Sequence, residues 1–171
     1  MNQWFTDQAR LGNMYQAVSA GAVTLSTVST TCTGLALSNP AGSGKLLVVQ
    51  HVAFQPSTAP AGAAVVGLSI HTAVSETAVT HTTPMVVHNA IAKGSTTAGV
   101  GLADAAATLP STPLWLRAMG CVVAGSSISP AKYEEICDGN ILIAPGGTLS
   151  LSYLTTAAVG IASACWVEVD E

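Results

Sequence analysis

The sequence predicts an all-β fold, an antiparallel sandwich or barrel. Beyond residue 20, short segments alternate between apolar and polar side chains, and clusters of Gly, Pro, Ser and Asn separate them. No segment in the interior of the chain has a convincing helical period. The 171 residues fit a single domain. We therefore expect residues 1–20 to form an N-terminal arm or helix and residues 21–171 to form one β domain.

Residues 1–20 carry large apolar side chains at steps of three, four and seven residues, a spacing that fits one face of a helix. A short helix and an extended arm both agree with this pattern. The segment either packs on the core of its own domain or docks on a neighbouring molecule. Aromatic and Met side chains are common interface anchors, and the partner-binding candidates are Trp4, Phe5, Leu11, Met14 and Tyr15.

The first half of the β region predicts three strands with clear breaks between them. Alternating and β-branched residues over 23–37 form the first, and the Asn, Pro and Gly residues of 38–44 end it. The continuous apolar run 45–54 predicts a strand buried on both faces, ended by the Pro-rich segment 55–62. The third strand is expected over 65–71, where apolar residues again share one face.

The second half predicts further short strands. Apolar patterns indicate strands at 85–91, 113–119, 148–154 and 161–169. Segment 94–112 consists mainly of Gly, Ala and Thr, so we expect a long loop or a short Ala-rich helix there.

Between residues 132 and 143 the pattern predicts two short strands joined by a tight turn. The strands are expected over 132–137 and 140–143. The intervening Asp138-Gly139 dipeptide is a typical hairpin signal.

The composition is unusually poor in charge. Five basic and nine acidic residues make up 8% of the chain, against about 25% in an ordinary soluble domain. The surface belongs either to a neutral monomer or to a protein covered by copies of itself or by a larger lattice. We favour the second because Lys, which protects exposed strand edges, is nearly absent. Too few cations are present for nucleic-acid binding, and no secretory signal, basic block or membrane-spanning run indicates a membrane partner.

The sequence predicts neither an enzyme nor a cofactor site. Gly44-Lys45 lacks the remaining residues of a phosphate-binding loop. Ser69 and His71 fall two residues apart on one strand, roughly 7 Å between their Cβ atoms, which is too far for a nucleophile and its base. The sequence contains no Cys-X-X-Cys pair of the kind that binds zinc. We therefore expect free, mostly buried thiols at Cys32, Cys121, Cys137 and Cys165.

Four histidines leave a metal hypothesis open. His71 and His81 would approach one another across a hairpin, but a metal site needs a third ligand, for which Asp104 or Glu76 are candidates. Isolated structural histidines are the favoured interpretation, although a symmetric assembly would also bring one His from each copy to an axis. His51 and His88 have no such context.

Charged residues near the later strands are interpreted as structural. Glu134 and Glu135 are adjacent, so on a strand they point to opposite faces and cannot act as a carboxylate pair. Arg117 follows Trp115 in an apolar strand. It is expected to pair with one of these acids or to stack on an aromatic ring.

The C-terminal third reads DGNILIAPGGTLSLSY over 138–153 and ASACWVE over 162–168. A strand, a Pro-Gly-Gly turn, an alternating strand and a final Trp-containing strand resemble the closing hairpins of phage jelly-roll structural proteins. With its size, low charge and N-terminal segment, the chain resembles a capsid cement, or decoration, protein of tailed bacteriophages. The resemblance implies an antiparallel jelly-roll-like β-sandwich of about eight strands. It also implies a homotrimer bound to the major capsid protein on the outside of the virion, after synthesis in the host cytoplasm.

The leading hypothesis is therefore a non-enzymatic virion protein that stabilises a phage head by binding at capsomer junctions. The alternative is a receptor- or glycan-binding head of a phage fibre or tail protein. The expected loops 55–62 and 94–112 contain no aromatic residue, which counts against that alternative. A small cupin-like enzyme is a third hypothesis, and it would need His and Glu ligands clustered on adjacent strands.

Overall fold

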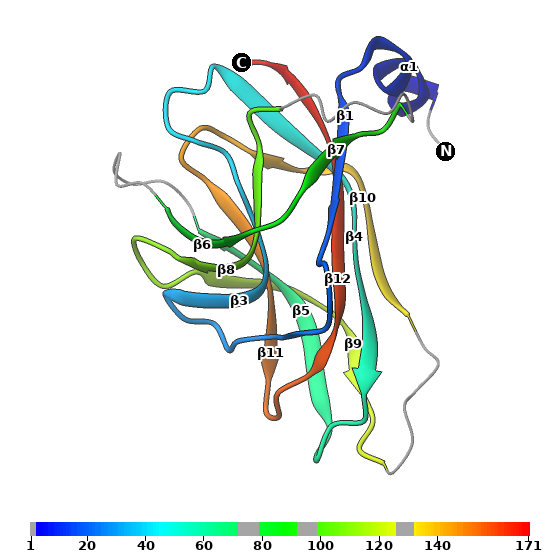
Figure 1. Ribbon diagram of the computed structural model, residues 1–171, viewed down its shortest axis with the longest axis vertical. Coiled ribbons are helices and arrows are strands. Elements are labelled where there is room, and N and C mark those ends of the chain that lie inside the picture. The colour runs from blue at the N-terminus through cyan, green and yellow to red at the C-terminus, as the bar shows by residue number, and fades with distance from the viewer. Residues whose placement is uncertain (1–2, 72–78, 92–98, 126–131) are drawn as a thin grey trace.

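The computed structural model describes residues 3–71, 79–91, 99–125 and 132–171. Within these residues, one short helix precedes two antiparallel β-sheets that pack face to face (Figure 1). The expected all-β sandwich with an N-terminal helix is thus confirmed.

The two sheets contain six strands each among the described residues. The first sheet has the order β10 (Tyr133–Ile143), β4 (Lys45–Thr58), β12 (Val159–Asp170), β1 (Met14–Val18) and β7 (Val87–Asn89), with β2 (Val23–Thr24) also paired to β12. The second has the order β6 (Thr80–Pro84), β8 (Leu102–Thr108), β3 (Thr31–Ser38), β11 (Thr148–Leu154), β5 (Ala64–His71) and β9 (Leu114–Val122).

Eight of these strands have the connectivity of a jelly roll. The chain repeatedly crosses from one sheet to the other, so that β1, β12, β4 and β10 are neighbours in the first sheet and β3, β11, β5 and β9 in the second. Each sheet thereby interleaves strands from the two ends of the chain, as two Greek keys require. The remaining short strands extend the sheets beyond β1 and β3 or pair with the end of β12.

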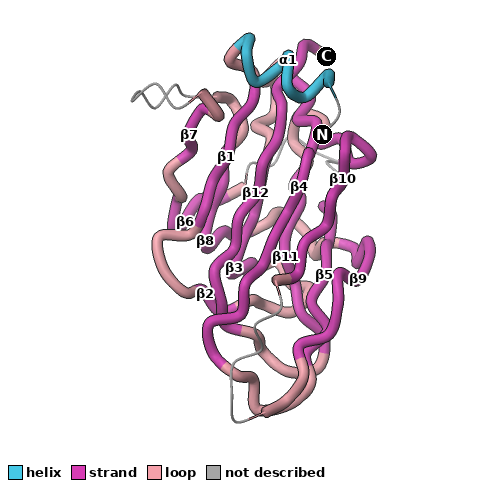
Figure 2. The backbone as a smooth tube through the Cα atoms, turned by 90° about the vertical axis from the view of Figure 1, so that its right-hand side faces the viewer, coloured by secondary structure: helices cyan, strands magenta, loops and turns pink. Residues whose placement is uncertain are grey.

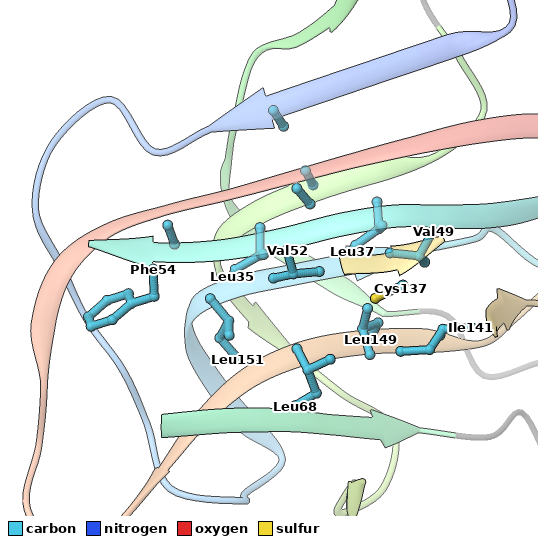
Figure 3. Packing of buried hydrophobic residues seen from close by; sticks show 14 of the residues in the cluster. Leu35, Leu37, Val49, Val52, Phe54, Leu68, Cys137, Ile141, Leu149 and Leu151 are labelled. Atoms are coloured by element: carbon cyan, nitrogen blue, oxygen red, sulfur yellow. The ribbon is translucent and has the colours of Figure 1, made fainter. Parts of the chain in front are cut away.

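The main core lies between the two sheets (Figure 3). Leu68 of β5 and Leu149 and Leu151 of β11 are almost fully buried and face Val52 and Phe54 of β4. On β4 the buried positions lie on both faces, as the continuous apolar run predicts. Trp166 and Phe54 are among the largest fully buried side chains of the sandwich.

The N-terminal helix α1 (Gln3–Leu11) covers one end of the outer face of the first sheet (Figure 2). It ends because Gly12 adopts a φ of 83°, while the N–H groups of Gly12 and Asn13 donate to the carbonyls of Ala9 and Gln8. These two bonds form a Schellman cap. Phe5 anchors the helix in a second apolar cluster beside Val167 of β12.

The segment outside the sandwich is shorter than the expected arm of residues 1–20. Met14–Val18 is strand β1, paired with β12 on one side and β7 on the other. The helical spacing of apolar residues therefore ends at the cap, because ladder hydrogen bonds to two strands determine the conformation beyond Gly12.

Two other expectations are corrected by the structure. The segment expected as a loop or Ala-rich helix contains strand β8, in which Ala103, Asp104 and Ala107 are the buried residues. Asp138 and Gly139 do not form a hairpin turn: both have positive φ, but they lie in a bulge within the continuous strand β10. Positive φ values occur in hairpin turns and in bulges alike. Here the residues before and after Asp138-Gly139 both pair with β4, so the two residues form a bulge.

Gly67 on β5 allows a close approach of strand β9. A Cβ atom there would press against the carbonyl oxygen of Arg117 and lie 2.8 Å from Cζ2 of Trp115. We expect Gly67→Ala to lower the free energy of unfolding by about 1–3 kcal/mol, the usual cost of overpacking. Urea denaturation measures this effect.

Gly21→Ala is the matched control, because an added Cβ at Gly21 would have no atom within 4 Å. The control should unfold at or slightly above the wild-type midpoint. Equal stability of the two variants would show that β9 does not approach β5 as closely as described.

Candidate interaction surface and cavity

The five sequence-predicted anchors do not form one surface. Phe5, Met14 and Tyr15 are at least nine-tenths buried within the chain itself. Trp4 and Leu11 are exposed on α1, with 38% and 70% of their surface accessible. One side of the N-terminal segment therefore packs on its own domain, which is one of the two alternatives considered from the sequence. The other side exposes Trp4 and Leu11, and docking on a neighbouring molecule stays a prediction.

The buried anchors have clear structural roles. Trp4 meets Phe5 edge to face, with ring centroids 4.9 Å apart. Tyr15 stacks on Trp166 of β12 at 6.2 Å. Because Tyr15 and Met14 lie on β1, their side chains attach this strand to the sandwich rather than to a partner.

The edge strands β9 and β10 carry a second group of exposed apolar residues. On β9 these are Leu114 and Leu116, and on β10 they are Ile136 and Leu142. Leu114 and Ile136 each expose about two thirds of their surface. An edge strand also presents unpaired backbone groups, so both strands have the features of association sites.

Side-chain contacts join β9 and β10 across the side of the sandwich. Arg117 Nη1 donates to Glu135 Oε1 at 2.7 Å, and Tyr133 Oη donates to the Cys121 carbonyl at 2.9 Å. This confirms the expected pairing of Arg117 with one of the two acids.

Glu134 lies on the opposite face of β10 from Glu135, as predicted. It contacts Lys132 at 2.6 Å and lies 4.0 Å from His51. The hydrogen bond from Lys132 lowers the pKa of Glu134. The two neighbouring acids are therefore separate ion-pair partners and not a catalytic pair.

A cavity of about 400 Å³ lies beside the contact between Arg117 and Glu135. Its walls come from β5, β9 and β10 and from the turn between β10 and β11, and they are mostly aliphatic. The lining residues are Ile70, His71, Leu116, Arg117, Asn140, Ile141, Leu142, Ile143, Ala144, Pro145, Gly147 and Thr148.

Two of the lining residues are buried and polar. His71 and Thr148 are register partners on β5 and β11, with 6% and 2% of their surface exposed. His71 Nε2 lies 2.8 Å from Ser111 Oγ, whereas His71 Nδ1 and Thr148 Oγ1 have no hydrogen-bond partner among the described residues. Burial lowers the pKa of His71, so the neutral imidazole is favoured.

The structure separates the histidines that were considered for a metal site. His71 contacts Ser111, whereas His81 Nδ1 lies 2.6 Å from Asp104 Oδ2. Burial raises the pKa of Asp104, and the contact with His81 opposes that shift. Glu76 lies outside the described residues. No group of three metal-ligating side chains occurs within the described ranges.

The cysteines do not provide a reactive site within the sandwich. Cys32, Cys137 and Cys165 are buried free thiols, and burial raises the pKa of each to about 11. A thiol with such a pKa is almost entirely protonated at neutral pH and is a poor nucleophile. Cys121 is free and exposed on β9.

One buried carboxylate has a purely structural environment. Glu168 on β12 accepts hydrogen bonds from the backbone N–H groups of Val100 and Gly101 and from the Trp166 indole. Three donors satisfy its charge in the interior. Glu168 thereby holds the chain that leads into β8 against the first sheet.

Comparison with protein-family models, with curated proteins and with solved structures finds no match to this chain. Among the described residues, no helix is long and apolar enough to cross a bilayer.

Sequence reasoning missed the cavity and the exposed residues of the edge strands. The cavity combines segments as far apart as Ile70 and Thr148, whose proximity follows only from the strand order. A local signal exists for the edges: β9 contains apolar residues at both alternating sets of positions, although only one set can face a core.

The burial of His71 predicts a pH-dependent stability. Its folded-state pKa lies below the ordinary value of 6.5. As the pH falls through this value, the unfolded chain takes up a proton more readily than the folded chain, and the free energy of unfolding decreases. His71→Gln should reduce this decrease, measured by urea denaturation at about pH 7.5 and about pH 5.5.

The loss of the Ser111 contact affects the variant at both pH values, so the difference between the two conditions is the readout. His51, whose pKa burial also lowers, is present in both proteins. An identical pH dependence for wild type and variant would contradict the assignment to His71.

Proposed function

We propose that this chain is a non-enzymatic virion structural protein, a cement or decoration protein that stabilises the head of a tailed bacteriophage. The observation that carries the proposal is the exposure of large apolar residues, notably Leu11, Leu114 and Ile136, on a chain with only 8% charged residues. Such residues are costly on a free surface and favourable in an interface. The jelly-roll scaffold and the phage-like closing hairpins support the assignment.

The helix α1 is the proposed contact with the major capsid protein. It lies at one end of the sandwich, and Phe5 fixes it to the domain. Leu11 and Trp4 therefore extend from a rigid support, and little conformational entropy is lost when they bind. Burial of apolar surface contributes about 25 cal/mol per Å², so a contact of several hundred Å² would reinforce a shell without any charge pair.

The edges at β9 and β10 are the proposed contact between copies. Contacts at these edges would be repeated from copy to copy, and we take the number of copies, three, from the homotrimer that the resemblance implies. Arg117 and Glu135 already neutralise each other within one copy, so this contact would rest on the exposed apolar residues Leu114 and Ile136. Deep pockets and catalytic groups are not needed for this function.

Leu11→Ser should weaken binding to phage heads while the protein remains folded. Leu11 is 70% exposed, so its truncation removes interface area without opening a cavity in the core. Loss of one interface anchor costs roughly 1 kcal/mol or more, about a fivefold loss of affinity. Co-sedimentation with heads of the phage that encodes the chain measures the affinity.

Leu154→Ser is the matched control for this measurement. Leu154 is also exposed, but it lies at the end of β11, distant from α1 (Figure 1). We expect it to bind like wild type. Failure of the wild-type protein to co-sediment with heads would overturn the proposed function, and equal binding of both variants would overturn the role of α1.

A double variant, Leu114→Ser with Ile136→Ser, should shift the oligomer toward monomer. Both side chains are exposed on the proposed contact edges, so the folded domain loses little when they are replaced. Sedimentation equilibrium over a concentration series measures the dissociation constant, with Leu154→Ser again as control. A wild-type chain that remains monomeric at high concentration would contradict the self-contact.

A further inference from the structure

A further exposed apolar surface lies on the side of the sandwich away from β9 and β10. Strands β10 and β9 stand at one end of the two sheets, and β7 and β6 stand at the other end (Figure 2). Pro84 ends β6 and Val87 begins β7, so only two residues link the sheets here. The proposed contact between copies uses the first side and leaves this one uncovered.

A hollow of about 290 Å³ lies where β7 leaves the edge of β1 free. Strand β7 pairs with residues 15–17 of β1 only. Val18 therefore has a ladder partner on β12 but none on its other side among the described residues. Val18 and Val86 both line the hollow, and they expose 50% and 60% of their surface.

The lining of the hollow is mostly apolar and carries no acidic or basic side chain apart from one histidine. The other apolar residues are Ala20, Pro84, Met85 and Ala105, and the polar ones are Thr83 and His88. Exposed apolar surface of this kind is favourable only when another apolar group covers it. An aliphatic side chain suits the hollow, because its burial needs no charged partner.

The edges at β9 and β10 offer such side chains without an unpaired charge. Ile136 of β10 exposes 66% of its surface. Glu135 contacts Arg117 at 2.7 Å, and this pair lies within one copy. Glu134 contacts Lys132 at 2.6 Å in the same way. A contact of this edge with the hollow therefore buries apolar surface and leaves the ion pairs intact, as the core of an interface favours.

Symmetry requires two different surfaces on each copy if three copies form a ring. A surface that meets its own equivalent gives a closed pair, whereas a ring of three joins one surface to another. We propose that the hollow at Val18 and Val86 receives the β9 and β10 edges of a second copy, with Leu114 and Ile136 as the inserted side chains. This inference rests on the proposed function, in which three copies associate through these edges.

Sedimentation equilibrium of the full chain tests the hollow. Val18→Ser with Val86→Ser should raise the dissociation constant of the oligomer at least about tenfold, because two interface anchors are lost. Leu154→Ser, at an exposed leucine on β11, should associate like wild type. Val86→Glu alone should also dissociate the oligomer, and it leaves β1 unchanged.

A mixing experiment tests which surface meets which. The hollow variant, Val18→Ser with Val86→Ser, keeps its edges, and the edge variant, Leu114→Ser with Ile136→Ser, keeps its hollow. Each should be monomeric alone, and an equal mixture should form pairs of one copy of each and nothing larger. Pairing that fails in the mixture would overturn the proposal.

The outcomes separate this inference from the proposed function. Hollow variants that associate like wild type would overturn the hollow and leave the contact between copies in place. Hollow variants that associate normally but no longer co-sediment with phage heads would assign the hollow to the capsid protein instead. A wild-type chain that stays monomeric would overturn both self-contacts, and co-sedimentation with heads measures the capsid contact separately.

Discussion

Strands β9 and β10 lie along the same side of the sandwich but belong to different sheets, and the described ladder hydrogen bonds do not join them. A jelly roll buries the inner faces of its sheets, but it cannot pair the strands at the end of each sheet. The side of the molecule at β9 and β10 is consequently held by side chains, through Arg117, Glu135 and Tyr133. The exposed apolar residues and the cavity both follow from this constraint.

At the centre of the first sheet, in contrast, ladder hydrogen bonds hold the strands together. Strand β12 pairs with β4 along almost its whole length and with β1 on its other side. Trp166 is fully buried there, and Glu168 is satisfied by three donors. The centre is therefore determined by ladders and packing together, so the end of the sheet at β10 can carry surface features without loss of the fold.

The sequence predicted the fold class and most strands because alternation and turn residues are local signals. It failed at β8, where Ala replaces larger residues on the buried face and the alternation becomes weak. It extended the N-terminal segment through β1, since the spacing of Met14 and Tyr15 also fits a helix. Only pairing with β12 and β7 excludes that conformation. The positive φ of Asp138 and Gly139 agrees with the turn signal in the sequence, but these residues lie in a bulge of β10 and not in a hairpin turn.

The candidate site was less accessible to sequence reasoning. Trp4 and Leu11 are exposed, so their role as anchors stays a prediction, whereas Phe5 is buried by contacts with β4 and β12 that its local sequence does not reveal. Pairing with an acid was one of the two roles predicted for Arg117, with stacking on an aromatic ring, since a cation in an apolar strand needs a partner. The cavity was not, because Ile70, Leu116 and Thr148 come together only when β5, β9 and β11 become neighbours in the second sheet.

A few buried polar atoms of the sandwich have no hydrogen-bond partner among the described residues. Four side-chain atoms are buried without a described partner, and two of them belong to residues that line the cavity beside Arg117. Replacing Thr148 by Val would remove one such group at almost no cost in volume, and a well-packed apolar neighbourhood would tolerate Val. The hydroxyl of Thr148 is therefore an unsatisfied buried group that lowers the stability of the sandwich, and the ladder and packing interactions around it offset this cost.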